Sequence, residues 1–307
     1  MRLPYGFLNS VVFLFCYVDG KPKAIGTGFF VETVDNFDGA AIMSIYLITA
    51  RHVVENASAK LGAEQIAVRA NGKNNNVLEW NVPIRSFLQS MNDGSSDITI
   101  LPFSIDYEVC DARPIQLWHY DSYYNLNVGE GTQTVTIGLF HRLVGENRNI
   151  PIVRTGYVAA VPNEPIKTFY GNTKMYIIES RSLGGLSGAP VISVTPGYAN
   201  PRVTTRLGSE MGYVLAGFDP QPSFNTEIKM NNSYTLMGLT HGHWDASLVL
   251  DEKGRSEVTR DDIDFINEGL SLVTPIERFF ELRKEDHVGD ELAQRAEDFW
   301  RKARDKS

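Results

Sequence analysis

The sequence is poor in cysteine, with only Cys16 and Cys110 among 307 residues. Two thiols this far apart do not form the disulfide framework of a small secreted domain. Free cysteine is usually a small buried apolar residue, so we interpret both as core thiols and predict a reducing, cytoplasmic compartment. The apolar run at residues 8–18 lacks a signal-peptide cleavage site and is too short to span a membrane. It ends at the turn-forming pair Asp19-Gly20, which predicts a first strand and a hairpin.

Clusters of basic residues are also missing. The chain has 29 Lys and Arg residues against 37 Asp and Glu, a formal net charge of −8, and the basic residues form no runs. This distribution argues against a nucleic-acid surface and against docking on anionic lipid. An acidic surface of this kind favours solubility.

Long stretches of helical periodicity are nearly absent before residue 275. Strand-like runs instead recur at short intervals, separated by Gly, Asn, Asp and Pro clusters, which is typical of an all-β fold. The predicted strands lie at residues 11–18, 25–33, 44–49, 65–70, 97–103, 132–139, 151–161, 174–180, 188–194, 212–218, 234–241 and 269–274. From Pro275 onward, apolar residues at helical spacing predict a C-terminal helix followed by a charged helix or tail.

Three short motifs carry the candidate chemistry. They are Thr-Ala-Arg-His at 49–52, Ser-Asp-Ile-Thr-Ile at 96–100 and Gly-Gly-Leu-Ser-Gly-Ala-Pro at 184–190. Their order places His52 first, Asp97 second and Ser187 last, which is one of the known chain orders of a Ser-His-Asp triad. Each residue alone has an ordinary explanation in a loop, a turn or a strand start. The three together, in this order and at spacings of 45 and 90 residues, predict a nucleophilic triad.

Small residues flank Ser187 on both sides, so the backbone can turn sharply and approach a substrate closely. In a serine hydrolase, the amides of Gly185 and Ser187 would point at the carbonyl oxygen that becomes negative. The same motif is compatible with a plain glycine-rich turn into the strand that follows.

The chain resembles the chymotrypsin/trypsin-like serine peptidase family, closer to its bacterial branches than to digestive trypsin. The resemblance covers about residues 5–276, and its motifs lie at residues 26–30, 47–54, 96–101 and 184–190. It implies two six-stranded antiparallel β-barrels of the chymotrypsin type with a C-terminal α-helix. It divides the chain into a peptidase unit at 1–276 (barrel one about 5–112, crossing 113–131, barrel two about 132–275) and a helix with a charged tail at 277–307.

The resemblance also implies roles for individual residues. His52 would be the general base and acid, Asp97 its orienter, Ser187 the nucleophile, and the Gly185 and Ser187 amides the oxyanion hole. The chain departs from the family at Leu186, where zymogen-activated members have an aspartate that pairs with a new N-terminus. Activation by N-terminal cleavage is therefore not expected.

Substrate specificity is the least determined property. The resemblance places the floor of the primary pocket at Arg181 and its walls at Thr240, His241, Gly242 and Gly269. An arginine or histidine there would attract a substrate carboxylate. Alternatively, Arg181 points into solvent or pairs with Glu179, and a pocket for small apolar side chains is the second possibility. The nearby His241, His243 and Asp245 could suggest a metal site, but zinc normally takes three or four ligands and no others are visible. We predict no metal and no cofactor.

The sequence thus predicts a serine endopeptidase that acts on proteins or peptides through an acyl-enzyme. Nucleic acid and membranes are not expected partners, and a regulatory partner remains open. Two alternatives stand beside this interpretation. One is a catalytically silent protease fold that serves as a binding or sensor module, and the other is an esterase.

Overall fold

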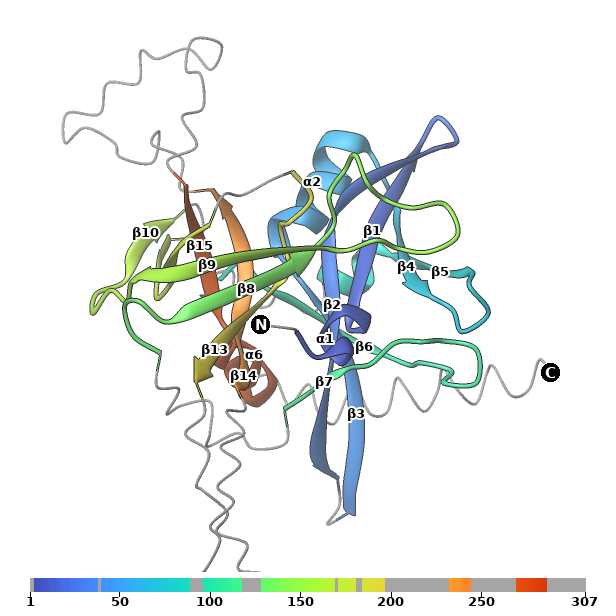
Figure 1. Ribbon diagram of the computed structural model, residues 1–307. Coiled ribbons are helices and arrows are strands. Elements are labelled where there is room, and N and C mark those ends of the chain that lie inside the picture. The colour runs from blue at the N-terminus through green and yellow to red at the C-terminus, as the bar shows by residue number, and fades with distance from the viewer. Residues whose placement is uncertain are drawn as a thin grey trace, which may run out of the picture. The chain divides into compact units, whose positions relative to one another are not determined.

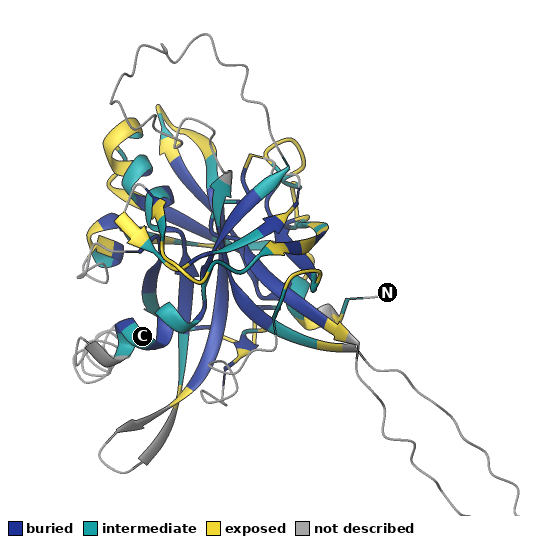
Figure 2. Ribbon diagram, turned by 90° about the vertical axis from the view of Figure 1, so that its left-hand side faces the viewer, coloured by how far each residue is buried: buried dark blue, intermediate teal, exposed yellow. Residues whose placement is uncertain are grey.

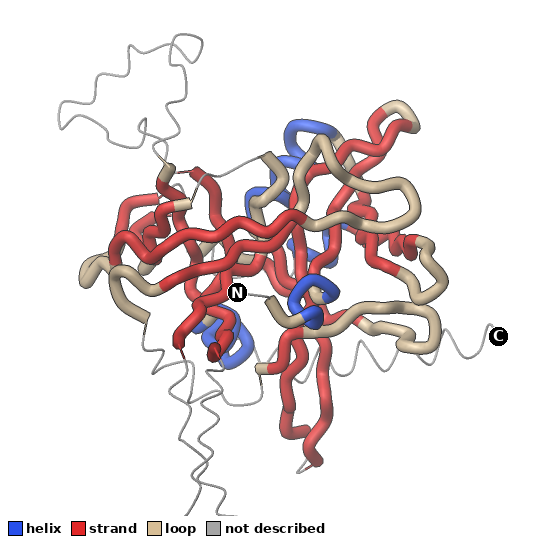
Figure 3. Tube along the Cα trace, in the orientation of Figure 1, coloured by secondary structure: helices blue, strands red, loops and turns tan. Residues whose placement is uncertain are grey.

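The computed structural model describes residues 3–37, 40–88, 96–117, 128–168, 171–180, 184–196, 232–243 and 269–285. Strands predominate in these ranges (Figures 1 and 3). The chain divides into two compact units, one made of Met1–Ser193 with Leu236–Ser307 and one made of Val194–Thr235. All residues of the site described below belong to the first unit. None of the helices in the described ranges is long and apolar enough to cross a membrane.

The N-terminal half forms a seven-stranded sheet. Its strands are β1 (Val11–Val18), β2 (Lys21–Phe37), β3 (Ala40–Thr49), β4 (Gln65–Asn71), β5 (Val77–Pro83), β6 (Thr99–Phe103) and β7 (Ile115–Gln116). The order is β5-β4-β1-β2-β3-β6, and β7 pairs in parallel with β2. The first six strands pair antiparallel with their neighbours.

The predicted first strand is confirmed as β1, at the bounds expected from the sequence. Its first six residues are all buried, because β1 lies between β2 and β4 near the middle of the sheet. Asp19 and Gly20 have φ angles of 51° and 72°, so the residues after β1 form the predicted turn into β2. Figure 2 shows the buried residues gathered along these central strands. Cys16 and Cys110 are both free and buried, as predicted.

The first sheet differs from the closed six-stranded barrel expected for residues 5–112. Among the described residues, its hydrogen-bonded path ends at β5 on one side and β6 on the other. Helix α3 (Ile84–Leu88) follows β5 directly, and the Phe87 carbonyl accepts a hydrogen bond of 3.0 Å from Thr99 Oγ1 of β6. The short helix α3 therefore contacts β6 at this edge, and in the described ranges no ladder of hydrogen bonds between β5 and β6 closes the sheet into a barrel.

The C-terminal half contains a closed six-stranded barrel, as the sequence predicts. Its order is β12-β15-β14-β13-β8-β9. The strands are β8 (Gln133–Gly138), β9 (Ile152–Ala160), β12 (Tyr176–Glu179), β13 (Pro190–Pro196), β14 (Asn232–His243) and β15 (Leu270–Pro275), and β10 (Ile166–Thr168) pairs separately with β11 (Gly171–Thr173). Its core includes Val158, Ile178, Val191, Met237 and Val273.

Helix α6 (Glu277–Glu285) follows the barrel and confirms the predicted C-terminal helix. Its buried Phe279 packs edge-on against Tyr46 of β3, with ring centroids 5.5 Å apart. Three further helices in the described ranges were not expected from the sequence, α1 (Tyr5–Asn9), α2 (Arg51–Leu61) and α3 (Ile84–Leu88). The predicted strand at 212–218 and the predicted helical segment at 290–301 lie outside the described residues.

Candidate active site

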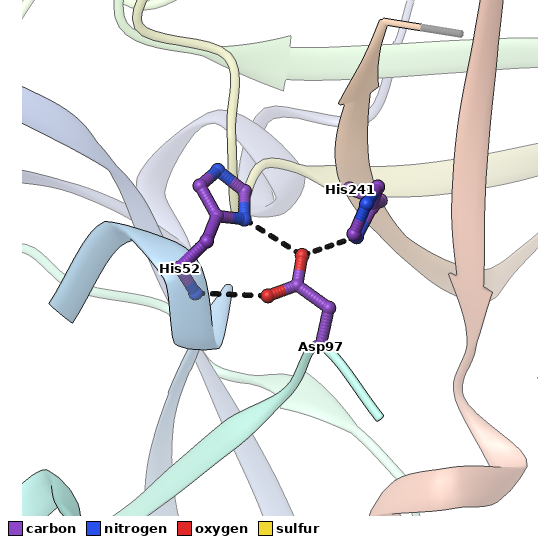
Figure 4. A group of neighbouring side chains, drawn as sticks. All are labelled: His52, Asp97 and His241. Atoms are coloured by element: carbon purple, nitrogen blue, oxygen red, sulfur yellow. Dashed lines mark hydrogen bonds and ion pairs between the residues drawn. The ribbon is translucent and has the colours of Figure 1, made fainter. Parts of the chain in front are cut away.

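His52 is the second residue of α2, which begins directly after β3. Its backbone N–H donates a 2.9 Å hydrogen bond to Asp97 Oδ1, and its ring Nδ1 lies 2.7 Å from Asp97 Oδ2 (Figure 4). The first N–H groups of a helix have no acceptor within the helix, and a carboxylate at this end also interacts favourably with the helix dipole. One side chain, Asp97, therefore caps α2 and orients the imidazole of His52.

Asp97 meets His52 because of the register between β3 and β6. Thr49, the last residue of β3, pairs with Thr99, the first residue of β6. Residues just after Thr49 and just before Thr99 must therefore lie at the same edge of the sheet. The 44 residues between His52 and Asp97 include the rest of α2, then β4, β5 and α3, and they return the chain to this edge.

The Asp97 side chain is 1% exposed. Burial by itself would raise the pKa of its carboxyl group. The neighbouring His52 charge and the hydrogen bonds from His241 and His52 act in the opposite direction and hold that pKa well below its usual range. Asp97 is therefore an ionised, acceptor-only group at neutral pH.

A second histidine, His241, contacts the same carboxylate. Its Nδ1 lies 2.5 Å from Asp97 Oδ2, and its ring centroid is 5.6 Å from that of His52 (Figure 4). Both imidazoles therefore contact the same carboxylate oxygen, Asp97 Oδ2. The sequence placed His241 in a pocket wall, and nothing in the sequence indicated that its ring contacts Asp97.

A β-bulge positions His241. In the pairing of β14 with β15, Thr240 is opposite Val273 and Gly242 is opposite Leu272, so His241 is the extra residue. A bulge breaks the alternation of side chains and re-aims the residue it contains. Thr240 is 2% exposed, and its backbone N–H and carbonyl pair with Ala189 and Gly188. The bulge thus lets two consecutive residues of β14 both serve the site.

Ser187 is half-buried in the loop that leads into β13. Its carbonyl accepts a 2.9 Å hydrogen bond from the Thr27 N–H of β2, and the next amide, Gly188 N–H, donates to the Thr240 carbonyl at 2.8 Å. A Cβ on Gly188 would meet Thr49 and Ala50, the residues immediately before α2. The loop is therefore packed close to the start of the helix that carries His52. Within the described part of the chain, no hydrogen bond joins Ser187 to His52.

The backbone segment with the two amides expected to form the oxyanion hole, those of Gly185 and Ser187, is held by the side chain of Thr27. The buried Thr27 Oγ1 donates a 2.6 Å hydrogen bond to the Gly185 carbonyl and accepts one of 2.9 Å from the Leu139 N–H. The N–H groups of Gly185 and Ser187 donate to no described residue. This role of Thr27 was not predicted from the sequence. The feature that could have indicated it is a threonine between two glycines, Gly26 and Gly28, in an otherwise apolar strand.

The remaining predicted residues have varied positions. Leu186 is 2% exposed, so its side chain is a buried apolar group. Gly269 accepts a 2.7 Å hydrogen bond from the Ser180 N–H through its carbonyl, and Gly242 ends the bulge with a φ of 152°. Arg181 lies outside the described residues, and nothing is described for the side chain of His243.

The cluster of His52, Asp97 and His241 also has the composition of a metal site, because its ligand atoms lie within 4.8 Å of one another. The two nitrogens are 2.7 and 2.5 Å from the same carboxylate oxygen. Tetrahedral zinc ligands with bonds of about 2.0–2.1 Å would lie about 3.3 Å apart. The arrangement is therefore a closed hydrogen-bonded cluster, and the three groups would have to separate before they could hold a metal ion.

Replacing Gly188 by alanine should destabilise the site strongly. Gly188 has a φ of 81°, and a Cβ there would collide with the Thr27 carbonyl oxygen and the Thr49 hydroxyl. Strain at positive φ and overpacking together predict a loss of about 2–5 kcal/mol in the free energy of unfolding, measured by urea titration. Gly62→Ala is the matched control, because Gly62 has a φ of 62° with nothing within 4 Å of the new Cβ. Equal losses in both variants would contradict the collision.

The sequence matches no protein-family model and no curated protein. Among solved structures, the chain is similar to the active form of the Rv3671c protease from M. tuberculosis, with 14% identity over 91% of this chain and 81% of that chain and a TM-score of 0.43. The inactive form of that protease, a serine-to-alanine mutant, gives 15% identity over 91% and 87% of the two chains and a TM-score of 0.41. The chain is also similar to the MamO protease domain from Magnetospirillum magneticum, with 15% identity over 64% of this chain and 89% of that chain and a TM-score of 0.39.

Proposed function

We propose that this protein is a serine endopeptidase of the chymotrypsin type, with Ser187 as nucleophile, His52 as general base and Asp97 as its orienter. The observation that carries the proposal is the two-point contact of Asp97 with His52, at 2.9 Å to the backbone nitrogen and 2.7 Å to Nδ1. An ionised carboxylate only accepts hydrogen bonds, so Nδ1 must carry a proton. The neutral ring then has an unprotonated Nε2, which is the atom a general base needs.

The proposed reaction has two stages. Ser187 Oγ attacks the substrate carbonyl carbon while His52 Nε2 takes the hydroxyl proton, and the carbonyl oxygen becomes an oxyanion. Collapse of this intermediate breaks the C–N bond, and His52 gives the proton to the leaving amine. Water then attacks the acyl-enzyme, again losing a proton to His52, and the acid product leaves as Ser187 regains its proton.

The backbone around Ser187 supports the role of the two amides. The Gly185 and Ser187 N–H groups are not used by any described residue, and the hydroxyl of Thr27 holds the Gly185 carbonyl, which belongs to the peptide group between these two N–H groups. Amides that are held in place before the reaction stabilise developing negative charge without reorganisation.

We further propose proteins or peptides as substrates. Because His241 contacts Asp97, its ring is committed to the carboxylate. Any attraction for an acidic side chain in the primary pocket is therefore assigned to Arg181, whose guanidinium stays charged at all relevant pH values.

A catalytically silent binding module is the second candidate. It is favoured by one observation, namely that no hydrogen bond joins Ser187 to His52 in the described ranges. Catalytic hydrogen bonds are often long in the absence of substrate, so this geometry is compatible with both candidates.

A fluorophosphonate probe separates the two candidates. Its phosphorus is attacked only by an activated serine, so the wild-type chain should be labelled covalently at Ser187, as identified by peptide mass spectrometry. Ser187→Ala and His52→Ala should both abolish labelling. Labelling of a denatured sample serves as the background. A wild-type chain that stays unlabelled in its folded state would support the silent module. Cleavage of a peptide library then separates a peptidase from an esterase.

A further inference from the structure

The Asp97 carboxylate serves two imidazoles at once. Oδ1 accepts from the His52 backbone N–H, while Oδ2 has two ring nitrogens close to it, Nδ1 of His52 and Nδ1 of His241 (Figure 4). Two imidazoles thus depend on one negative charge. The proposed function needs only the imidazole of His52. His241 is the extra residue of a β-bulge in β14, and from this position it contacts the carboxylate.

We propose that His241 is a positioning residue for the catalytic pair and must be neutral for the enzyme to work. His241 holds Asp97 Oδ2 in place through its own Nδ1. This inference rests on the proposed function, because it assigns a role within the same site.

The charge balance gives the reason. When His52 takes the proton of Ser187, it becomes a cation that the single charge of Asp97 stabilises. If His241 already carries a second proton, two cations with ring centroids 5.6 Å apart share one carboxylate. A like charge at 4–6 Å disfavours protonation of its neighbour, so the transition state loses stabilisation. The rate of catalysis should therefore fall at low pH through the uptake of two protons, one on each imidazole.

Other charged groups near the pair are already matched with partners. On α2, Arg51 pairs with Glu55 at 2.7 Å. On α6, Arg278 pairs with Glu281 at 2.7 Å and donates through Nε to Ser96 Oγ, next to Asp97, at 3.1 Å. Residues 26–30 of β2 and residues 184–190 of the nucleophile loop contain no charged side chain. Among the described residues packed around the site, His52 and His241 are thus the histidines that contact the carboxylate, whereas His141 packs against Gly185 of the nucleophile loop.

Two substitutions test the role. His241→Asn keeps an N–H donor close to the position of Nδ1 but cannot take up a proton, whereas His241→Leu removes the donor. In the wild type, log kcat/KM should fall on the acidic side with a slope steeper than one, because two protons are involved. His241→Asn should show a slope of one and a plateau within about threefold of the wild type. His241→Leu should lose about 10–100-fold in kcat with little change in KM, since misplaced catalytic groups cost rates of this order.

His243→Asn removes an imidazole two residues further along β14 and should keep the steeper slope. A His241→Asn variant with an unchanged slope would overturn the role of His241. If His241→Leu does not fold, the His241→Asn profile alone decides the question.

Proton NMR gives a readout that does not depend on activity. Imidazole N–H protons held against a carboxylate resonate far downfield, so the wild type should show two such signals and His241→Asn only one. A single signal in the wild type would contradict the shared carboxylate. Two signals in a wild-type chain that neither labels nor hydrolyses peptides would overturn the proposed function, and with it the catalytic role of His241, although the contact itself would stand.

Discussion

Ser187→Ala should lower kcat for peptide hydrolysis by about 10⁴–10⁶-fold, because no other group in the triad can form the acyl-enzyme. His52→Ala should have an effect of similar size, since the hydroxyl of Ser187 is a weak nucleophile without a base. The double variant should be hardly slower than either single variant, because residues of a triad act as one unit. The measurement is kcat with a fluorogenic peptide, after titration of active sites in the wild type.

Ser58→Ala is the matched control, as Ser58 is an exposed serine on α2, the helix that carries His52. It should hydrolyse peptide at the wild-type rate. Residual hydrolysis above the rate in water is expected in the Ser187 variant, since oriented backbone amides still stabilise the oxyanion. A Ser187→Ala chain that keeps more than a tenth of the wild-type rate would show that the nucleophile has been misassigned.

The strands could be predicted because their information is local. Residues 11–18 are apolar, β-branched and aromatic, and a turn-forming pair follows, so β1 is found at the expected bounds. The same reasoning missed β5, whose sequence Val-Leu-Glu-Trp-Asn-Val-Pro has only partial alternation and ends in proline. At the edge of the sheet, pairing with β4 outweighs the weak local pattern.

Helix α2 was missed for a different reason. Its N-cap residue is Ala50, which offers no side-chain hydrogen bond to the helix. The residues that normally signal a helix start are Ser, Thr, Asp and Asn, and none occupies this position. The capping carboxylate is instead Asp97, 45 residues further along the chain. A helix cap supplied by a residue that is distant in the sequence cannot be predicted from the residues next to the helix.

The candidate site was likewise only partly readable. His52 and Asp97 could be paired from the order of their motifs, and the structure brings them into contact. The position of His241 could not be read, because it depends on a one-residue bulge that shifts the register of β14 against β15. A shift of one residue moves a side chain to the other face of a strand, so regular alternation could not predict the contact of His241 with Asp97.

Asp97→Asn should lower kcat by about 10⁴-fold, the size expected when a triad histidine is held in the wrong tautomer. All three groups that face Asp97 are donors, namely the His52 backbone N–H and the two ring Nδ1 atoms. Asparagine offers one acceptor oxygen and one NH₂ group. If its oxygen keeps the backbone N–H of His52, its NH₂ must face both Nδ1 atoms. Each ring can accept that donor only by moving its own proton to Nε2.

That tautomer removes the base, because an Nε2 that carries a proton cannot take one from Ser187. The loss should therefore appear in kcat and in the rate of fluorophosphonate labelling. The midpoint of thermal unfolding should stay close to that of the wild type, because the asparagine oxygen still caps α2. Asp106→Asn is the matched control, since Asp106 is exposed and the substitution removes the same charge; it should leave both rates unchanged. A loss of less than tenfold in Asp97→Asn would mean that His52 keeps a working tautomer without the carboxylate. The contact between Asp97 and His52 would then hold the fold together without serving catalysis.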